Sequence, residues 1–463
     1  MKLRKEILRL ALPSILANIT VPLVGMVDMA IAGHLGTQGY SSAALIGGIT
    51  IGTMLFDLLY WNFGFLRVGT GGLTAQAYGR KMAGQAGDEI HGILQRALRV
   101  AVLSGLGLIV LQWVVVQLAF LVVDCTPEVR RLATQYFYIR IWAAPATLSL
   151  FAFKGWFIGL QDTVRPMTAD LLVNGVNIVA SVLLALVMGF PGIALGTVLA
   201  QWVGFTYCFL AARRRYGWHL THYKSATYKN FSAPFGTEKK LEGVDTEEVK
   251  RQEGSLNRDL ILRSVGMIAV YIGFTVLSAR YGDVLLAVSA ILMKFLMFFS
   301  YFTDGFAYAG EALTGRFIGE GSREGVRATV RGTFLWSLGV MALFMLVYGI
   351  GGVPLLHLMT DDPAVVQAGR AFLPWLLLMP LIGCPAFVWD GIFIGATASK
   401  DLRNSTLLCA AGFFAVWFLG VGYMPTAEAA IHLLMAAYFV HLAIRALYLT
   451  LRYPVIFSDI SSR

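Results

Sequence analysis

Charged side chains are scarce in this chain of 463 residues. Asp, Glu, Lys and Arg make up 14% of it and hydrophobic residues 57%, whereas soluble globular domains carry about 25% charged residues. The shortage excludes a disordered chain and argues against a soluble multidomain enzyme. The formal net charge is +10. We attribute it to basic cytoplasmic loops of a membrane protein and predict no nucleic-acid partner.

Residues for catalysis, metal binding and ATP use are also lacking. The four cysteines lie far apart, without metal-ligand spacing or a disulfide framework, and the seven histidines show no ligand pairing. No Walker phosphate loop and no catalytic cluster of nucleophile and base occurs. We therefore predict neither an enzyme nor a bound cofactor or metal.

Long apolar blocks are present instead, for example at 100–123, 171–190 and 332–352. Each is about 20 residues long, which spans the hydrocarbon core of a bilayer as a helix. The fold class predicted is an all-α polytopic membrane protein with twelve transmembrane helices. The predicted spans are 7–33, 42–66, 92–122, 129–152, 166–189, 192–212, 259–280, 284–308, 326–350, 364–388, 402–422 and 428–451.

Basic residues recur at alternate ends of these helices, which by the positive-inside rule places both termini in the cytoplasm. The basic N-terminus runs directly into the first apolar block, without a small-residue cleavage site. We therefore expect a first membrane helix and not a removed signal peptide.

One long polar segment, 213–257, divides the chain into an N-terminal six-helix bundle at 1–212 and a C-terminal one at 258–463. We interpret this segment as a cytoplasmic linker with a short surface helix, or alternatively as a regulatory or partner-binding segment.

The two halves share two motifs at matching places. Residues 64–69 (GFLRVG) match 305–310 (GFAYAG), and 154–159 (KGWFIG) match 390–395 (DGIFIG). With an even number of helices in each half, the halves are predicted to be parallel repeats, related by a pseudo-twofold axis along the membrane normal. Two such bundles can rock to expose a central site alternately on each side.

An ionisable residue inside a membrane helix is costly and marks a functional candidate. Asp28 lies in the apolar first helix, where burial favours its protonated form, so it is our candidate for proton coupling; a structural hydrogen-bonding role is the alternative. Pro22, six residues earlier, interrupts the backbone hydrogen bonds and is the candidate hinge, although the kink could be static.

Polar residues of the fifth predicted helix share one face: Asp170, Asn174, Asn177 and Ser181 are spaced by 4, 3 and 4. They are predicted to line a substrate cavity or to bond neighbouring helices. In the fourth helix, Tyr138 and Arg140 join these candidates, and Arg140 is expected either to pair with Asp28 or to be structural.

The C-terminal half carries further embedded charges. These secondary candidates are Lys294, Asp304, Glu311 and Asp390. They form either a second cation site or an internal ion-pair network, and we favour the network because a lysine is among them.

Nearly the whole chain resembles the multidrug and toxic compound extrusion (MATE) family, in its DinF-like branch. The motifs that carry the resemblance are 9–13 (RLALP), 18–28 (NITVPLVGMVD), 33–36 (GHLG), 72–77 (GLTAQA), 304–312 (DGFAYAGEA) and 390–397 (DGIFIGAT). The resemblance implies a V-shaped antiporter in the bacterial plasma (inner) membrane. It implies export of lipophilic, often cationic compounds, with Asp28 as the proton-coupling carboxyl and helix-1 bending at Pro22.

One departure from the family concerns Ser181, where many relatives carry an aspartate. This loss places coupling on Asp28, helped by Asp170, and disfavours sodium binding in the N-terminal half. Sodium coupling and a lipid or glycan-lipid flippase of related architecture stay as alternatives. The expected partners are small molecules, protons and membrane lipids, and the expected state is a monomer.

Overall fold

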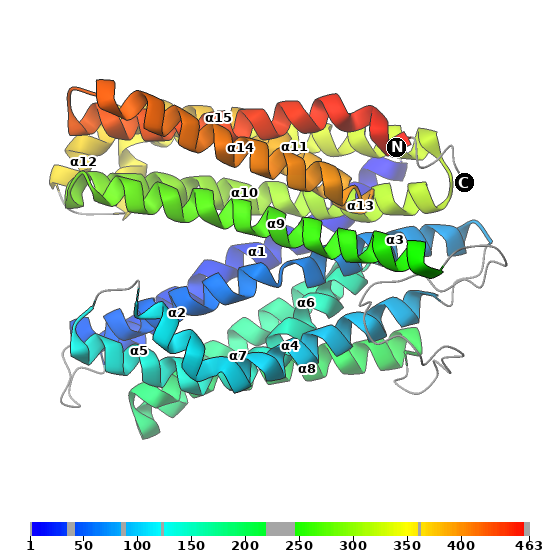
Figure 1. Cartoon of the computed structure of the whole chain (residues 1–463), viewed down its shortest axis with the longest axis horizontal. Coiled ribbons are helices and arrows are strands. Elements are labelled where there is room, and N and C mark those ends of the chain that lie inside the picture. The colour runs from blue at the N-terminus through cyan, green and yellow to red at the C-terminus, as the bar shows by residue number, and fades with distance from the viewer. Residues whose placement is uncertain are drawn as a thin grey trace. The chain divides into compact units, whose positions relative to one another are not determined.

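The computed structural model describes residues 2–34, 42–84, 89–121, 125–218, 246–359 and 363–457. Within these ranges the chain is helical, without strands (Figure 1). The α-helices are α1 (Lys2–His34), α2 (Ser42–Asn62), α3 (Phe65–Met82), α4 (Glu89–Ala119), α5 (Pro127–Arg140), α6 (Ala144–Gly159), α7 (Val164–Met188), α8 (Phe190–Tyr216), α9 (Thr246–Ala279), α10 (Asp283–Gly319), α11 (Arg323–Met359), α12 (Pro363–Gly369), α13 (Leu373–Gly395), α14 (Ser399–Gly420) and α15 (Ala427–Arg452).

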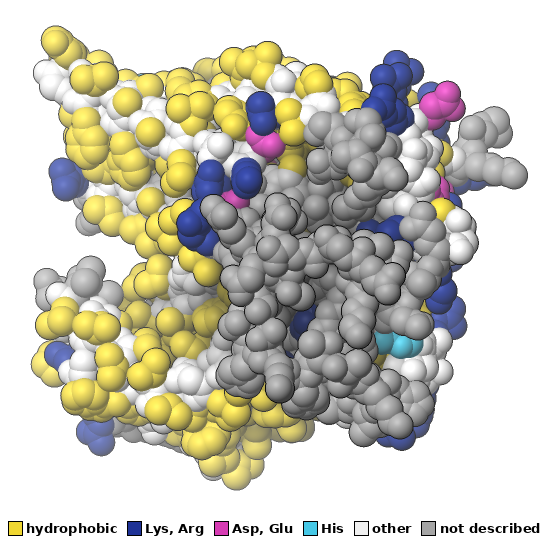
Figure 2. Space-filling view, turned by 45° about the vertical axis from the view of Figure 1, so that its right-hand side comes forward, with side chains coloured by type: hydrophobic (Ala, Val, Ile, Leu, Met, Phe, Trp, Pro, Cys, Tyr) yellow, Lys and Arg dark blue, Asp and Glu magenta, His cyan; other side chains and the backbone are white. Residues whose placement is uncertain are grey.

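Eleven stretches of the described chain are long and apolar enough to cross a membrane. Large hydrophobic side chains point outward from them: Val110 on α4 is 81% exposed and Val187 on α7 is 83% exposed. Such surfaces suit lipid contact, because the exposed apolar patches of soluble proteins are small. Figure 2 shows hydrophobic side chains over much of the described surface on its left, with Lys and Arg more frequent on its right. The predicted all-α polytopic class is confirmed.

Two predicted membrane helices are divided in the structure. The second breaks at a turn around Phe63 and Gly64, after which α3 begins. The fourth breaks where the 3-10 turn Ile141–Ala143 separates α5 from α6. Pro145 lies in the first turn of α6, where its missing N–H costs no hydrogen bond.

The ends of the predicted linker are helical. α8 continues to Tyr216 and closes on Gly217, whose φ of 63° suits glycine. α9 begins at Thr246. Residues 219–245 lie outside the described ranges.

Contacts divide the chain into two units. One comprises Met1–Ile15, Gly79–Ala83 and Ser255–Arg463, and the other comprises Leu16–Tyr78 and Gly84–Gly254. The N-terminal bundle was predicted to begin at residue 1, whereas the first residues of α1 pack with the C-terminal half. Arg316 Nη1 donates to Glu6 Oε1 at 3.0 Å within that unit.

The paired sequence motifs touch each other inside each unit. A Cβ added at Gly155 would lie 2.2 Å from the carbonyl oxygen of Arg67, and one at Gly391 would lie 2.1 Å from that of Ala307. In both units a glycine of the second motif thus lets its helix approach the backbone of the first motif. The sequence repeat is therefore also a repeat of packing.

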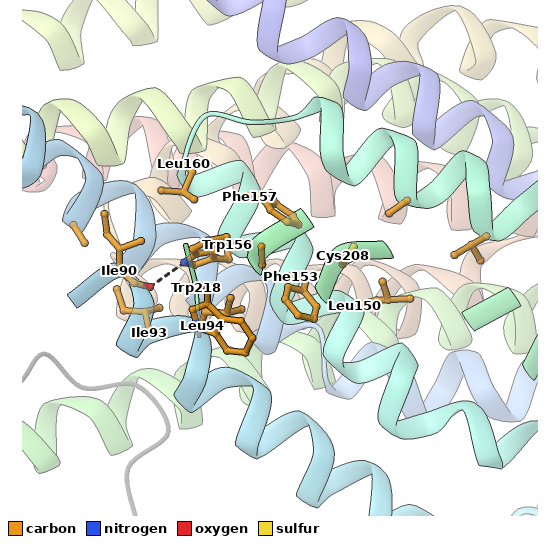
Figure 3. Packing of buried hydrophobic residues seen from close by; sticks show 14 of the residues in the cluster. Ile90, Ile93, Leu94, Leu150, Phe153, Trp156, Phe157, Leu160, Cys208 and Trp218 are labelled. Atoms are coloured by element: carbon orange, nitrogen blue, oxygen red, sulfur yellow. Dashed lines mark hydrogen bonds between the residues drawn. The ribbon is translucent and has the colours of Figure 1, made fainter. Parts of the chain in front are cut away.

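The unit that contains α4, α6 and α8 has a dense aromatic core (Figure 3). Phe153, Trp156 and Phe157 of α6 are buried there together with Trp218, just past α8. Trp156 Nε1 donates to the carbonyl of Ile90 at 2.9 Å, which satisfies the buried indole N–H. This core ties α4, α6 and α8 together and holds α7 at its side.

Candidate transport site

Asp28 is buried in α1, with 5% of its surface exposed. Its carboxyl accepts a hydrogen bond from the Ser181 side chain of α7 and interacts electrostatically with Arg140. Among the described residues Asp28 Oδ1 has no hydrogen-bond partner. A buried carboxyl with spare acceptor capacity and a hydroxyl neighbour is a group that can take up and release a proton.

The polar face of α7 points toward neighbouring helices. Asn174 Nδ2 donates to Thr20 Oγ1 of α1 at 2.6 Å, and Asn177 Nδ2 donates to Thr197 Oγ1 of α8 at 2.9 Å. Ser181 Oγ also lies 3.3 Å from the carbonyl oxygen of Ile193. These residues thus form hydrogen bonds between neighbouring helices, which is one of the two roles predicted for them. Their role in lining a substrate cavity stays a prediction.

Asp170, at the start of the same face, is separate from this group. It forms an ion pair with Lys154 of α6, and both side chains are about one-fifth exposed, at 20% and 22%. The arrangement joins α6 to α7. Its partner in this ion pair is Lys154 and not Asp28, Asn174 or Ser181.

Arg140 ends α5 beside α2. Its Nη1 donates to Tyr136 Oη at 3.2 Å and to Thr53 Oγ1 at 3.4 Å. The guanidinium lies over the Phe56 ring, 4.8 Å from the centroid. Tyr138 is half-buried and its ring makes an edge contact with Phe137.

Asp57 of α2 was missed in the sequence analysis. It interacts electrostatically with Arg140, as do Asp28, Tyr60 and Tyr136. The signal was available, because Asp57 stands between apolar residues in a predicted membrane helix, as Asp28 does.

Pro22 lies within α1, which is continuous from Lys2 to His34. Its side chain falls outside the described part of the structure. A hinge at this position therefore stays a prediction.

Embedded charges of the C-terminal half meet at Asp390 of α13. Arg263 Nη2 of α9 donates to Asp390 Oδ2 at 2.8 Å, and Arg445 Nε of α15 donates to Asp390 Oδ1 at 3.0 Å. Asp304 of α10 interacts electrostatically with Arg445. The basic members of this network were not among the predicted residues.

The other two secondary candidates, Lys294 and Glu311, both lie on α10. Lys294 is exposed on α10. Glu311 is fully buried on α10, and its backbone carbonyl faces Gly395 of the repeated motif. The ion pairs at Asp390 thus involve arginines and not the lysine that the sequence suggested.

Long apolar helices, two units with a repeated packing motif and a buried carboxyl define a polytopic transport protein built from internal repeats. The sequence matches the MatE family over residues 13–183 and 260–416. The chain belongs to this family, the multidrug and toxic compound extrusion transporters.

Relatives and solved structures agree with this assignment. DNA damage-inducible protein F of Escherichia coli K12 is 33% identical over 452 residues, which cover 96% of this chain and 90% of that protein. The probable multidrug resistance protein NorM of Xanthomonas axonopodis is 24% identical, covering 89% and 84%. The Vibrio cholerae MATE transporter VcmN in its bent form has a similar fold, with a TM-score of 0.79 at 17% identity over 100% of this chain and 98% of that one.

Proposed function

We propose that the chain is a proton-coupled exporter of lipophilic, cationic compounds. It resides in the bacterial plasma membrane, with both termini in the cytoplasm. Asp28 binds the coupling proton, and the two bundles expose the substrate site alternately. The observation that carries this proposal is the burial of Asp28 between the Ser181 hydroxyl and the field of Arg140, within a member of the MATE family.

The surroundings of Asp28 favour a proton over sodium. A sodium ion needs several oxygen ligands and is repelled by a nearby positive charge. Ser181 supplies one neutral oxygen where a second carboxylate would help a metal ion, and Arg140 supplies a positive charge. A proton needs only one acceptor oxygen, which Asp28 provides.

The test is efflux from proteoliposomes. We expect an imposed proton gradient to drive export of a lipophilic cation such as ethidium, and a sodium gradient at constant pH to drive none. Asp28→Asn cannot exchange a proton and should lower gradient-driven export at least tenfold. Glu128→Gln, which removes an exposed carboxylate from the first turn of α5, is the matched control and should export as wild type does.

Two results would contradict the proposal. Export by Asp28→Asn at the wild-type rate would remove Asp28 from coupling. Export driven by sodium alone would assign the coupling to sodium.

A further inference from the structure

The exposed face of α2 combines apolar side chains with one carboxylate. Thr50, Met54, Asp57 and Trp61 follow each other at intervals of 4, 3 and 4 residues, so they form one stripe on the helix. Met54 is 46% exposed and Trp61 is 41% exposed, and Asp57 is exposed between them.

The opposite face of α2 is closed by α5. A Cβ added at Gly48 would lie 2.7 Å from Leu132, and one at Gly52 would lie 2.6 Å from Tyr136. Phe56 stacks on Phe137 with ring centroids 4.7 Å apart. Because this face is packed, the orientation of α2 is set, and the stripe that contains Asp57 lies on the side of α2 turned away from Leu132 and Tyr136.

Asp57 cannot face lipid. It lies ten residues after Gly47, where the apolar span begins, which is about 15 Å along the helix axis and about half of a hydrocarbon core of about 30 Å. A carboxylate in contact with lipid at that depth is strongly unfavourable. An exposed stripe that carries a carboxylate suits contact with water or a polar or charged bound molecule. A carboxylate flanked by Met54 and Trp61 complements a lipophilic organic cation, because it supplies the opposite charge, an aromatic face and a flexible apolar contact.

Arg140 interacts electrostatically both with Asp57 of this stripe and with Asp28, the buried acid of α1. It is held at Thr53, one turn before Asp57 on the same side of α2. The charged and titratable groups that act on it are Tyr136, Tyr60, Asp57 and Asp28. One guanidinium therefore interacts with two carboxylates, one exposed and one buried.

We propose that Asp57 binds the positive charge of the exported compound and that Arg140 links this site to Asp28, so that protonation of Asp28 expels the cation. The inference rests on the proton coupling proposed above. With both carboxylates ionised, the two negative charges and one positive charge leave a net charge of −1, which attracts a cation. When Asp28 takes up a proton, the net charge becomes zero and Arg140 is balanced by Asp57 alone.

The bound cation and the proton thus oppose each other without competing for the same carboxylate. By linkage, the cation must weaken proton binding by the same factor as the proton weakens cation binding. This opposition is what an antiporter requires, since substrate is bound from the cytoplasm and released when a proton arrives from outside.

The experiment is equilibrium binding of tetraphenylphosphonium, a permanent lipophilic cation, to the purified full-length protein in nanodiscs between pH 5.5 and 8.5. Triphenylphosphine oxide, a neutral lipophile, serves as the comparison ligand. We expect wild type to bind the cation at least tenfold more tightly at the alkaline end, while binding of the neutral ligand stays constant.

Variants separate the roles. Asp57→Asn should weaken binding of the cation at least tenfold at pH 8.5 and leave the neutral ligand within twofold, which also shows that the variant is folded. Asp28→Asn, which resembles the protonated state, should bind the cation weakly and independently of pH. Glu128→Gln should match wild type in every measurement.

Two outcomes would overturn this inference: tetraphenylphosphonium binding by Asp57→Asn within twofold of wild type, or wild-type affinity that does not change with pH. Failure of the proposed function is seen separately in the efflux assay. If Asp28→Asn loses gradient-driven export but Asp57→Asn binds and exports the cation normally, proton coupling stands and only the role of Asp57 is lost.

Discussion

Embedded carboxylates in this protein differ in what surrounds them, and this difference decides what each can do. Asp28 has one hydroxyl neighbour, Ser181, and lies in the field of Arg140. Asp390 is held by two arginines, Arg263 and Arg445, of which Arg445 is 2% exposed. A carboxylate in direct contact with two guanidinium groups serves to neutralise them.

Asp390→Asn should therefore be strongly destabilising, because it leaves two largely buried arginines without their carboxylate. Breaking a buried ion pair from one side costs about 3–5 kcal/mol. Asp170→Asn breaks a pair with partly exposed members and should cost no more than about 1 kcal/mol.

Thermal unfolding of both variants in the same detergent measures the contrast. Equal losses of stability in Asp390→Asn and Asp170→Asn would show that Asp390 is not needed to neutralise Arg263 and Arg445.

The sequence alone identified those residues that stand as a single acid within an apolar block. Asp28 and Asp390 were identified in this way, and Asp57 could have been. The partners could not be identified, because Ser181 lies 153 positions after Asp28 in the chain and Arg445 lies 55 after Asp390. Only packing brings those pairs together.

Helices of this fold approach each other closely where the repeated motifs meet. Gly155→Ala and Gly391→Ala would each place a Cβ about 2 Å from a backbone oxygen, at 2.2 Å from Arg67 and 2.1 Å from Ala307. Because backbone cannot move aside as a side chain does, the helices must separate. We expect each variant to lose stability by about 1–3 kcal/mol, the usual cost of overpacking.

Gly107→Ala in α4 is the matched control, since a Cβ there meets no atom within 4 Å. Alanine is the better helix former by about 1 kcal/mol, so this variant should be as stable as wild type or slightly more stable. Thermal unfolding of the three variants tests the comparison. A stable Gly391→Ala would mean that the repeat motifs do not set the helix spacing.

Helix boundaries within the apolar blocks were the part of the fold that hydrophobicity could not resolve. The turn at Gly64 and the 3-10 turn before Pro145 both interrupt stretches that are predominantly apolar. Pro145 was a usable signal, since proline favours the first turn of a helix and thereby marks a new start. The ends of the linker at 213–257 were predicted from polarity. In the structure α9 already begins within these polar residues, at Thr246.

At the scale of the whole chain, composition and the internal repeat predicted an all-α polytopic membrane protein. Every helix that crosses a bilayer needs about the same apolar length, and each copy of the repeat needs the same close helix contacts. Assignment of Met1–Ile15 to the unit of the C-terminal half was not predictable, since α1 is one uninterrupted helix. The deciding contacts, such as Glu6 with Arg316, join residues 310 positions apart.

The orientation of the whole chain is open to a direct test. Basic residues close several helices on one side, for example Arg80 and Lys81 at the end of α3 and Arg213–Arg215 at the end of α8. The positive-inside rule places these ends in the cytoplasm, and the even number of predicted spans places both termini there.

Green fluorescent protein fused after Arg463 should therefore fluoresce, and alkaline phosphatase at the same position should be inactive. A fusion after residue 38, between the first two predicted spans, should show the reverse pattern. Active phosphatase after Arg463 would contradict the orientation and, with it, the direction of export, because the proton and the substrate would then enter from the opposite sides.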